Sequence, residues 1–173
     1  MRRHKRPDWD DYFLIICEAV SSRSHDENTQ NGSVIVDQYR RIVSTGYNGF
    51  PAGVDDEFWP HEREAKVHIP FVDGSKSTMY VVDKYMPMTH AESNAIVSAR
   101  TDLQGCTIYT PLFPCHECSK LIITAGIKRV VYRVMRENIS WAVSKELLLQ
   151  AKVSLVGPLL PDQDAEASSG CSG

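Results

Sequence analysis

Hydrophobic residues recur along this chain at two spacings, one typical of helices and the other of strands. Apolar positions from Trp9 to Ser22 fall at helical intervals and predict an amphipathic helix. Val34–Val36 and Arg41–Tyr47 are joined by a short polar segment and predict an antiparallel hairpin. Further short strands are expected at Cys106–Thr110, Val130–Arg133 and Val153–Val156, with helical patterns that begin near His90, Cys115 and Ser140. This alternation predicts a layered α/β domain.

The stretch between Gly49 and His90 interrupts the alternation. It contains Pro51, Pro60, Pro70 and Pro87, many charges and little periodicity. A connection this long inside a compact domain is usually functional and less often a mobile linker, so residues 50–89 are predicted to form a lid, a binding insertion or a regulatory region.

The last stretch, residues 161–173, is poor in apolar residues and rich in serine, glycine and acidic residues. That composition predicts a disordered tail. Residues 1–160 are therefore expected to form one domain, because a chain of 173 residues with 42% hydrophobic content can bury a core of its own.

Charge and cysteine content narrow the setting of the protein. The formal net charge of −3 offers no basic surface for nucleic acid. Five unevenly spread cysteines argue against a secreted disulfide scaffold and favour a reducing compartment, so we expect a cytoplasmic protein. No apolar run reaches the length of a membrane span, and the basic N-terminus is not followed by a signal-peptide core.

Two short motifs carry candidate metal chemistry, His90-x-Glu92 and Pro114-Cys115-x-x-Cys118. Zinc prefers nitrogen and sulfur ligands, and a site with three protein ligands keeps a fourth position for water, as catalytic sites do. Pro114 suits the start of a helix, which would put both sulfurs on one side of its first turn. The positive end of the helix dipole favours thiolates there. His90, Cys115 and Cys118 are therefore predicted to bind a catalytic zinc ion.

Glu92 is predicted to be the general acid and base of this site. Bound zinc lowers the pKa of its water to about 7, but a side chain must still move the protons. Glu92 lies two residues beyond the histidine, where it can do so without binding the metal. The order and spacing of these positions match the signature of zinc-dependent nucleobase deaminases.

Two other interpretations of the cysteines are open. A structural zinc knuckle would need a fourth ligand, for which Cys106, His116, His61 and His68 are candidates, and it would leave Glu92 without a role. A redox dithiol usually follows the first strand of a small domain, whereas this pair comes late in the chain.

With these residues in view, the chain from about Trp9 to Val156 resembles the deoxycytidylate deaminases of the cytidine deaminase superfamily. Besides the metal motifs, the resemblance is carried by Trp9–Phe13, Arg23-Ser24, Gly46–Pro51, Ser93–Ile96, Leu112-Phe113 and Ala125–Ile127. The long insertion distinguishes the chain from tRNA adenosine deaminases, which have a shorter link there. The resemblance implies a three-layer cytidine-deaminase-like α/β fold, with a five-stranded mixed sheet flanked by helices, and one zinc ion per chain.

The resemblance also implies an activity, the hydrolysis of dCMP to dUMP and ammonia, which feeds thymidylate synthesis. Glu92 would protonate N3 of the ring and then the departing amine. The residues expected to bind the substrate are Asn48, Ala91, Asn28, Thr29, Arg23 and Arg136. Asn48 would contact the sugar or the base edge, although an asparagine before a glycine is also a common turn residue. The phosphate needs cationic or amide donors.

Regulation is a further expectation from the resemblance. Family members are activated by dCTP with Mg²⁺, inhibited by dTTP, and commonly hexameric. Tyr47, Asn48, Gly49 and Phe50, with the insertion beyond them, would carry the regulatory pocket.

The chain departs from the family at one segment. Asn31-Gly32-Ser33 stands where Val-Gly-Ala is typical, which puts polar groups beside the expected base pocket. Two alternative functions are a deaminase acting on tRNA or single-stranded nucleic acid and a noncatalytic zinc-bearing nucleotide sensor.

Overall fold

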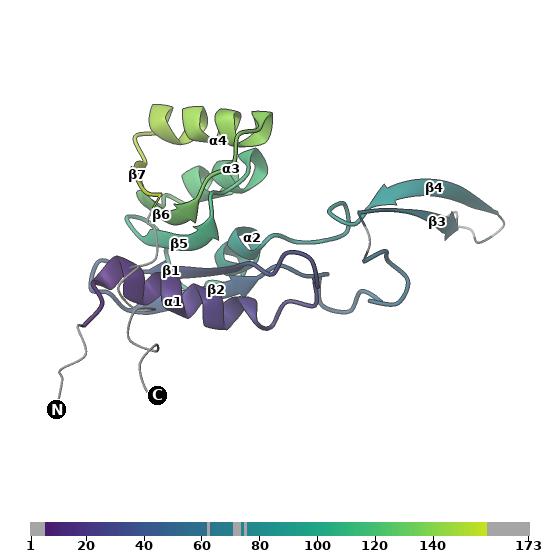
Figure 1. The fold of residues 1–173 in the computed structure, drawn as a ribbon, viewed down its shortest axis with the longest axis horizontal. Helices are drawn as coiled ribbons and strands as arrows, with labels where there is room; N and C mark the ends of the chain where they lie inside the picture. The colour runs from purple at the N-terminus through teal and green to yellow at the C-terminus, as the bar shows by residue number, and fades with distance from the viewer. Residues whose placement is uncertain (1–5, 62, 71–73, 75, 159–173) are drawn as a thin grey trace, which may run out of the picture.

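The computed structural model describes residues 6–61, 63–70, 74 and 76–158 of the chain, and the predicted tail, 161–173, lies outside them. A five-stranded sheet of strand order β2-β1-β5-β6-β7 forms the centre of the molecule (Figure 1). Its strands are β1 (Gly32–Val36), β2 (Ile42–Tyr47), β5 (Thr107–Leu112), β6 (Arg129–Val134) and β7 (Ser154–Val156). β1 runs antiparallel to β2 and β5, whereas β5, β6 and β7 are parallel, so the sheet is mixed as expected.

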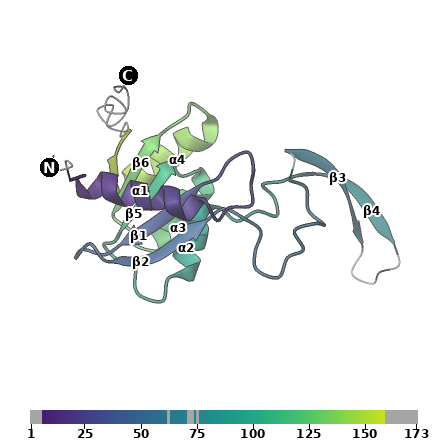
Figure 2. The ribbon, with the colours of Figure 1, turned by 60° about the horizontal axis from the view of Figure 1, so that its bottom comes forward.

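Helices cover both faces of the sheet and complete three layers. They are α1 (Trp9–Ser21), α2 (Ala91–Ser98), α3 (His116–Thr124) and α4 (Ile139–Gln150). Figure 2 shows α1 lying across one face, where Val34 and Val36 of β1 pack in its cluster. Ile35 points to the opposite face and joins the larger core beneath the other helices. The layered fold predicted from the sequence is confirmed.

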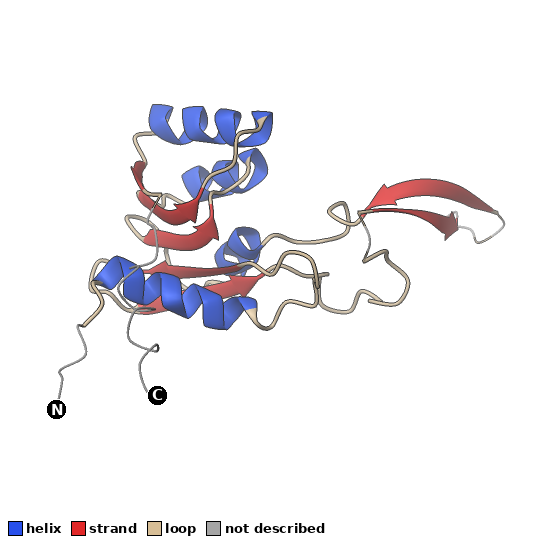
Figure 3. Cartoon of the chain, viewed as in Figure 1, coloured by secondary structure: helices blue, strands red, loops and turns tan. Residues whose placement is uncertain are grey.

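The insertion holds two strands that the sequence analysis did not predict. β3 (Glu64–Pro70) and β4 (Ser77–Asp83) pair antiparallel as a separate two-stranded sheet. This arm, formed by β3 and β4, extends away from the body of the molecule (Figure 3). The expectation of little periodicity was wrong here, because Ala65, Val67 and Ile69 alternate with polar residues along β3.

Two contacts fix the base of the insertion. Gly49 and Thr89, at its two ends, form an isolated antiparallel bridge whose N–H···O distances are 3.1 and 2.8 Å. Lys84, just after β4, donates to both carboxylate oxygens of Asp26 at 2.8 and 2.9 Å. The two ends of the insertion are therefore paired with each other, and its base is also bound to the loop that follows α1.

The ion pair between Asp26 and Lys84 is buried, with side-chain exposures of 1% and 3%. Burial alone would raise the pKa of Asp26, but hydrogen bonds from Lys84 and from the Asn28 and Thr29 amides outweigh it and hold the pKa below its usual value. The same carboxylate thus orders the backbone of residues 28 and 29 and the base of the arm.

None of the helices that the structure describes has the length and apolar character that a membrane span requires.

The Lys84→Met variant should lower the free energy of unfolding by about 3 kcal/mol, because it leaves a buried carboxylate without its cation. Urea denaturation of the zinc-loaded protein measures this difference. The double variant Asp26→Asn with Lys84→Met should recover part of the loss. Lys66→Met, at an exposed position of β3, is the matched control. Equal stability of the Lys84 and Lys66 variants would contradict the prediction.

Candidate active site

The metal motifs lie at the N-termini of two helices. His90 is the N-cap of α2 and Cys115 the N-cap of α3, and both have extended backbone. In the described chain neither side chain caps its own helix, so both are available to a ligand. Cys118 lies in the first turn of α3 and is buried. The sequence predicted this arrangement from Pro114 and the cysteine spacing.

A close approach of α2 to the sheet sets the position of the first motif. Gly46 of β2 lies directly under α2, where a Cβ atom would be 2.2 Å from the Ala95 nitrogen and 2.4 Å from the Ala91 oxygen. Any larger residue would push the helix away. Asn94 also donates to the Tyr47 carbonyl at 2.7 Å. The glycine of the Gly46–Pro51 segment therefore determines how deeply α2 packs.

The three predicted ligands converge on one point. His90 Nδ1 lies 3.3 Å from Cys115 Sγ and 3.4 Å from Cys118 Sγ. Tetrahedral zinc, with bonds of roughly 2.0 Å to nitrogen and 2.3 Å to sulfur, places such atoms about 3.5 Å apart. Among the described residues, His90, Cys115 and Cys118 form a group whose ligand atoms all lie within 4.8 Å of one another, close enough to hold a metal ion. One imidazole and two thiols fit zinc.

Protons are shared among the ligands in the protein without metal. Contact with the Cys118 thiol lowers the pKa of Cys115 to about 3, although desolvation opposes this, and His90 lowers it further. The same contact with Cys115 raises the pKa of Cys118. Its hydrogen bond with Cys115 raises the pKa of His90. Metal binding must therefore displace protons from this group.

Glu92 lies beside the ligands, in the first turn of α2, with 4% of its surface exposed. Its Oε2 accepts from the Cys118 thiol at 3.5 Å, and its Oε1 accepts from the Thr110 hydroxyl at 3.2 Å. Burial raises the pKa of Glu92, while the charge of His90 opposes the increase. A raised pKa suits a carboxyl group that must both take and give a proton near neutral pH.

A cavity of about 120 Å³ opens onto these groups. It is lined by Thr29, Asn31, Asn48, His90, Ala91, Glu92, Leu112, Phe113, Cys115 and Trp141. Of the predicted substrate residues, Asn48, Thr29 and Ala91 therefore border it. Arg23 and Arg136 are exposed and lie outside this lining as the described residues form it. Asn28 borders a separate hollow with Arg63, Lys84 and Tyr85.

Sequence reasoning missed the apolar side of the cavity. Trp141 lies in the first turn of α4, well beyond the metal motifs, whereas Leu112 ends β5 and Phe113 follows it. The signal that could have found Trp141 is topological. Helices α3 and α4 follow the parallel strands β5 and β6, and the carboxyl ends of neighbouring parallel strands meet at one edge of a sheet, where ligands bind.

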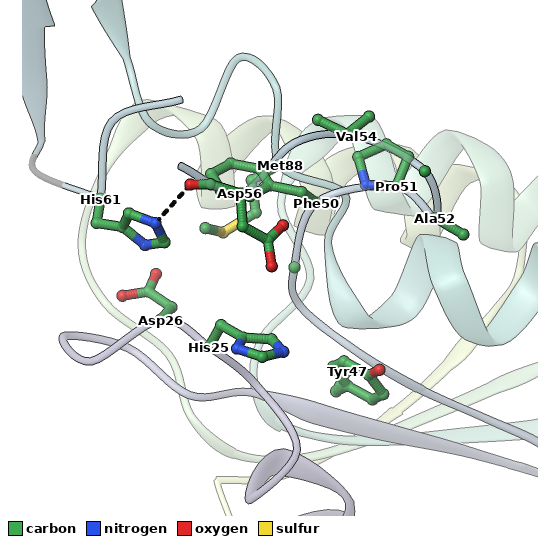
Figure 4. Close-up of a pocket in the computed structure, with 12 residues that line it drawn as sticks. His25, Asp26, Tyr47, Phe50, Pro51, Ala52, Val54, Asp56, His61 and Met88 are labelled. Carbon is green, nitrogen blue, oxygen red and sulfur yellow. Dashed lines mark hydrogen bonds between the residues drawn. The ribbon is translucent and has the colours of Figure 1, made fainter. Parts of the chain in front are cut away.

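A second hollow, of about 200 Å³, lies at the base of the insertion (Figure 4). Its lining residues are His25, Asp26, Tyr47, Gly49, Phe50, Pro51, Ala52, Gly53, Val54, Asp56, His61 and Met88. Three of the four predicted regulatory residues, Tyr47, Gly49 and Phe50, are among them. Asn48 borders the cavity beside Glu92 instead.

Asn48 connects the two hollows. Its Oδ1 accepts from the Asn31 amide at 2.7 Å, and its Nδ2 donates to the Thr29 carbonyl at 2.9 Å, so it orders one wall of the first cavity. Nδ2 also lies 3.6 Å from the sulfur of Met88, which lines the second hollow. The residue does more than form a turn before Gly49.

A family model described as the cytidine and deoxycytidylate deaminase zinc-binding region matches residues 7–134. The chain belongs to this family. It is therefore a hydrolytic deaminase, and His90, Cys115 and Cys118 are arranged as a possible metal site. Membership disfavours both the zinc-knuckle and the redox interpretations of the cysteines. The family recognised from the sequence is confirmed.

Individual relatives agree with the family. A probable deoxycytidylate deaminase of Drosophila melanogaster is 44% identical over 133 residues, which cover 75% of this chain and 62% of that protein. The deoxycytidylate deaminase of Mycobacterium phage D29 is 42% identical over 129 residues, or 73% of this chain and 95% of the phage protein. The chain spans 62 to 73% of the length of the animal relatives it matches.

A solved structure supports the same fold. The dCMP deaminase of cyanophage S-TIM5, crystallised in complex with dCMP and dUMP, aligns with a TM-score of 0.61 and 25% identity. The alignment covers 88% of this chain and 98% of the phage chain.

Cys118→Ser should lower zinc affinity by more than ~100-fold, because loss of a ligand should cost more than loss of an outer hydrogen-bond partner, typically 10- to 100-fold. Zinc content after dialysis, measured by atomic absorption, checks this. Cys106→Ser is the matched control, since Cys106 is a buried core cysteine outside the ligand group. Full zinc content in the Cys118 variant would disprove the ligand assignment.

Proposed function

We propose that this deaminase hydrolyses dCMP to dUMP and ammonia in the cytoplasm and so feeds thymidylate synthesis. The supporting observation is that one cavity is lined by His90 and Cys115 of the candidate metal group, by the buried Glu92 and by Asn48, with Cys118 of the same group buried beside His90 and Cys115. The names of the relatives agree, as does the S-TIM5 enzyme crystallised with dCMP and dUMP.

Glu92 moves the protons in this proposal. Zinc held by the three ligands supplies a Lewis acid that makes water nucleophilic near neutral pH. Glu92 takes a proton from the attacking water and delivers it to N3 of the cytosine ring as a C–O bond forms at C4. It then transfers the second water proton to the exocyclic amine, the C4–N4 bond breaks, and ammonia leaves. Burial of Glu92 keeps bulk water from competing for these protons.

The remaining walls suit a flat polar base. Leu112, Phe113 and Trp141 provide apolar surface. Asn48 uses Oδ1 once and directs its Nδ2 hydrogens to the Thr29 carbonyl and the Met88 sulfur, which leaves one Oδ1 lone pair for the base or the sugar. Ala91, between His90 and Glu92, borders the same cavity.

The phosphate would lie toward the hollow of about 380 Å³ that Asn28 shares with Arg63, Lys84 and Tyr85. Asn28 is next in sequence to Thr29 of the catalytic cavity. Arg63 is exposed, whereas Lys84 is already paired with Asp26. An amide and a guanidinium are suitable donors for a phosphate. Arg23 and Arg136 stay candidates from the sequence.

Purified zinc-loaded protein should release ammonia from dCMP at least ~10-fold more efficiently than from cytidine, deoxycytidine or dCTP. Glu92→Gln should keep its zinc and lose ~10²- to 10⁴-fold in kcat, because the amide cannot transfer protons. A coupled ammonia assay measures both. Preferential turnover of tRNA or single-stranded DNA would favour the polynucleotide deaminase, and binding of dCMP without turnover would favour the nucleotide sensor.

We further propose that the second hollow binds a regulatory nucleotide, with dCTP and Mg²⁺ activating and dTTP inhibiting, in a homo-oligomer that is a hexamer. Tyr47 and Phe50 offer aromatic surface for a base, and Asp56 offers carboxylate oxygens of the kind that Mg²⁺ prefers. Figure 4 shows His25 and His61 facing the same space. Asn48 gives this pocket a direct route to the catalytic wall through Met88.

The Phe50→Ala variant should weaken the response to dCTP with Mg²⁺ by at least ~10-fold in the concentration needed for activation. The activity of each variant with dCTP and Mg²⁺ is divided by its own activity without them, so that a change in basal rate does not affect the measured activation. Phe58→Ala removes an exposed aromatic outside the pocket lining and is the control. A wild-type protein whose dCMP dependence ignores both dCTP and dTTP would refute the regulatory proposal.

A further inference from the structure

Two buried polar residues stand behind the catalytic carboxyl group. Asn31 precedes β1 and is 8% exposed, and Thr110 lies in β5 with none of its surface exposed. Asn31 borders the cavity, whereas Thr110 is absent from its lining as the described residues form it. Asn31 therefore places an amide in the wall of the cavity.

These side chains form a continuous hydrogen-bonded chain to Glu92. Asn31 Nδ2 donates to Thr110 Oγ1 at 3.3 Å. Thr110 Oγ1 in turn donates to Glu92 Oε1 at 3.2 Å. The other oxygen of Glu92 accepts from Cys118 at 3.5 Å. Zinc binding would remove the Cys118 proton, so of these two contacts the hydrogen bond from Thr110 is the one that would remain.

Thr110 has a second acceptor, the Leu112 carbonyl, at 3.1 Å. A hydroxyl group carries one hydrogen and can also accept. The Thr110 hydroxyl can donate to Glu92 when Glu92 is a carboxylate. When Glu92 carries the transferred proton, the hydroxyl can donate to the Leu112 carbonyl and accept from the Glu92 carboxyl group. Asn31 donates to one lone pair of the Thr110 hydroxyl oxygen. The hydroxyl hydrogen can then point either to Glu92 or to the Leu112 carbonyl. The arrangement can support Glu92 through both halves of a proton transfer.

Packing alone does not account for Asn31. Its backbone is held by Asn48, which accepts from the Asn31 N–H at 2.7 Å and donates to its carbonyl at 3.2 Å. Its side-chain Oδ1 is buried without a hydrogen-bond partner among the described residues. Such an atom costs stability, typically about 1–3 kcal/mol, whereas valine would cost nothing of this kind. A residue kept at that cost points to a role at the site.

We propose that Asn31 and Thr110 are positioning residues that fix the Glu92 carboxyl for proton transfer, an inference that rests on the proposed deamination. Loss of the hydroxyl should leave the carboxyl free to rotate away from its working orientation. Substrate binding should be little affected by a change at Thr110, because this side chain lies behind Glu92 rather than in the cavity.

Thr110→Val removes the hydroxyl and keeps the shape of the side chain. Its kcat for dCMP should fall ~10-fold or more, with KM and zinc content within ~2-fold of wild type. Thr110→Ser restores the hydroxyl and should recover kcat to within ~3-fold, which a merely structural role would not predict. Asn31→Val should also lower kcat, and the double variant should be no slower than Thr110→Val, since both act through Glu92.

Crystal structures of the zinc-loaded Thr110→Val and Thr110→Ser variants give a readout that does not depend on turnover. The Glu92 carboxyl should be displaced or adopt several conformations in the valine variant and be unchanged in the serine variant. An unmoved Glu92 in Thr110→Val, or an unchanged kcat, would overturn the inference. A wild-type protein inactive on dCMP would refute the proposed function instead, and the crystal structures would still decide the role of Thr110.

Discussion

Everything in this molecule that bears on chemistry depends on two helices beginning at the same point. A metal ion can take two donors from one short segment and a third from a distant residue only if both backbones are fixed to within a fraction of an ångström. Here two of the three predicted ligands, His90 and Cys115, are the N-cap residues themselves, so the start of each helix also sets the position of a donor atom. The sheet contributes by setting the depth of α2 through Gly46.

The polar residues around the site act as a connected set. Asn48 joins the loop after α1 to β2, Asn31 extends from it to Thr110, and Thr110 reaches Glu92. Each link is buried, where a hydrogen bond is stronger and a missing partner more costly than in water. The wall opposite is apolar, with Phe113 packed edge-on against Trp141. One side of the cavity is therefore suited to orienting polar atoms and the other to holding a ring.

The sequence predicted the parts of this structure that depend on local order. The strands, the helices and the metal triad come from periodicity and from spacings of a few residues, so a single chain is enough to find them. Trp141 and Thr110 could not be assigned in this way, because neither belongs to a motif and each lies near the site only in the folded chain, Trp141 in α4 and Thr110 in β5. Asn31 was noticed as a departure, but its partner Thr110 lies far along the chain. The arm was missed because prolines and charges obscured its alternation.

The bridge between Gly49 and Thr89 closes the insertion into a loop whose two ends are paired with each other. The insertion leaves the body of the molecule and returns to it at this bridge, immediately before His90. Doubling the length of such a loop costs only about 0.6 kcal/mol in chain entropy. The insertion can therefore vary in length at little cost in chain entropy without moving His90, which follows it in the chain.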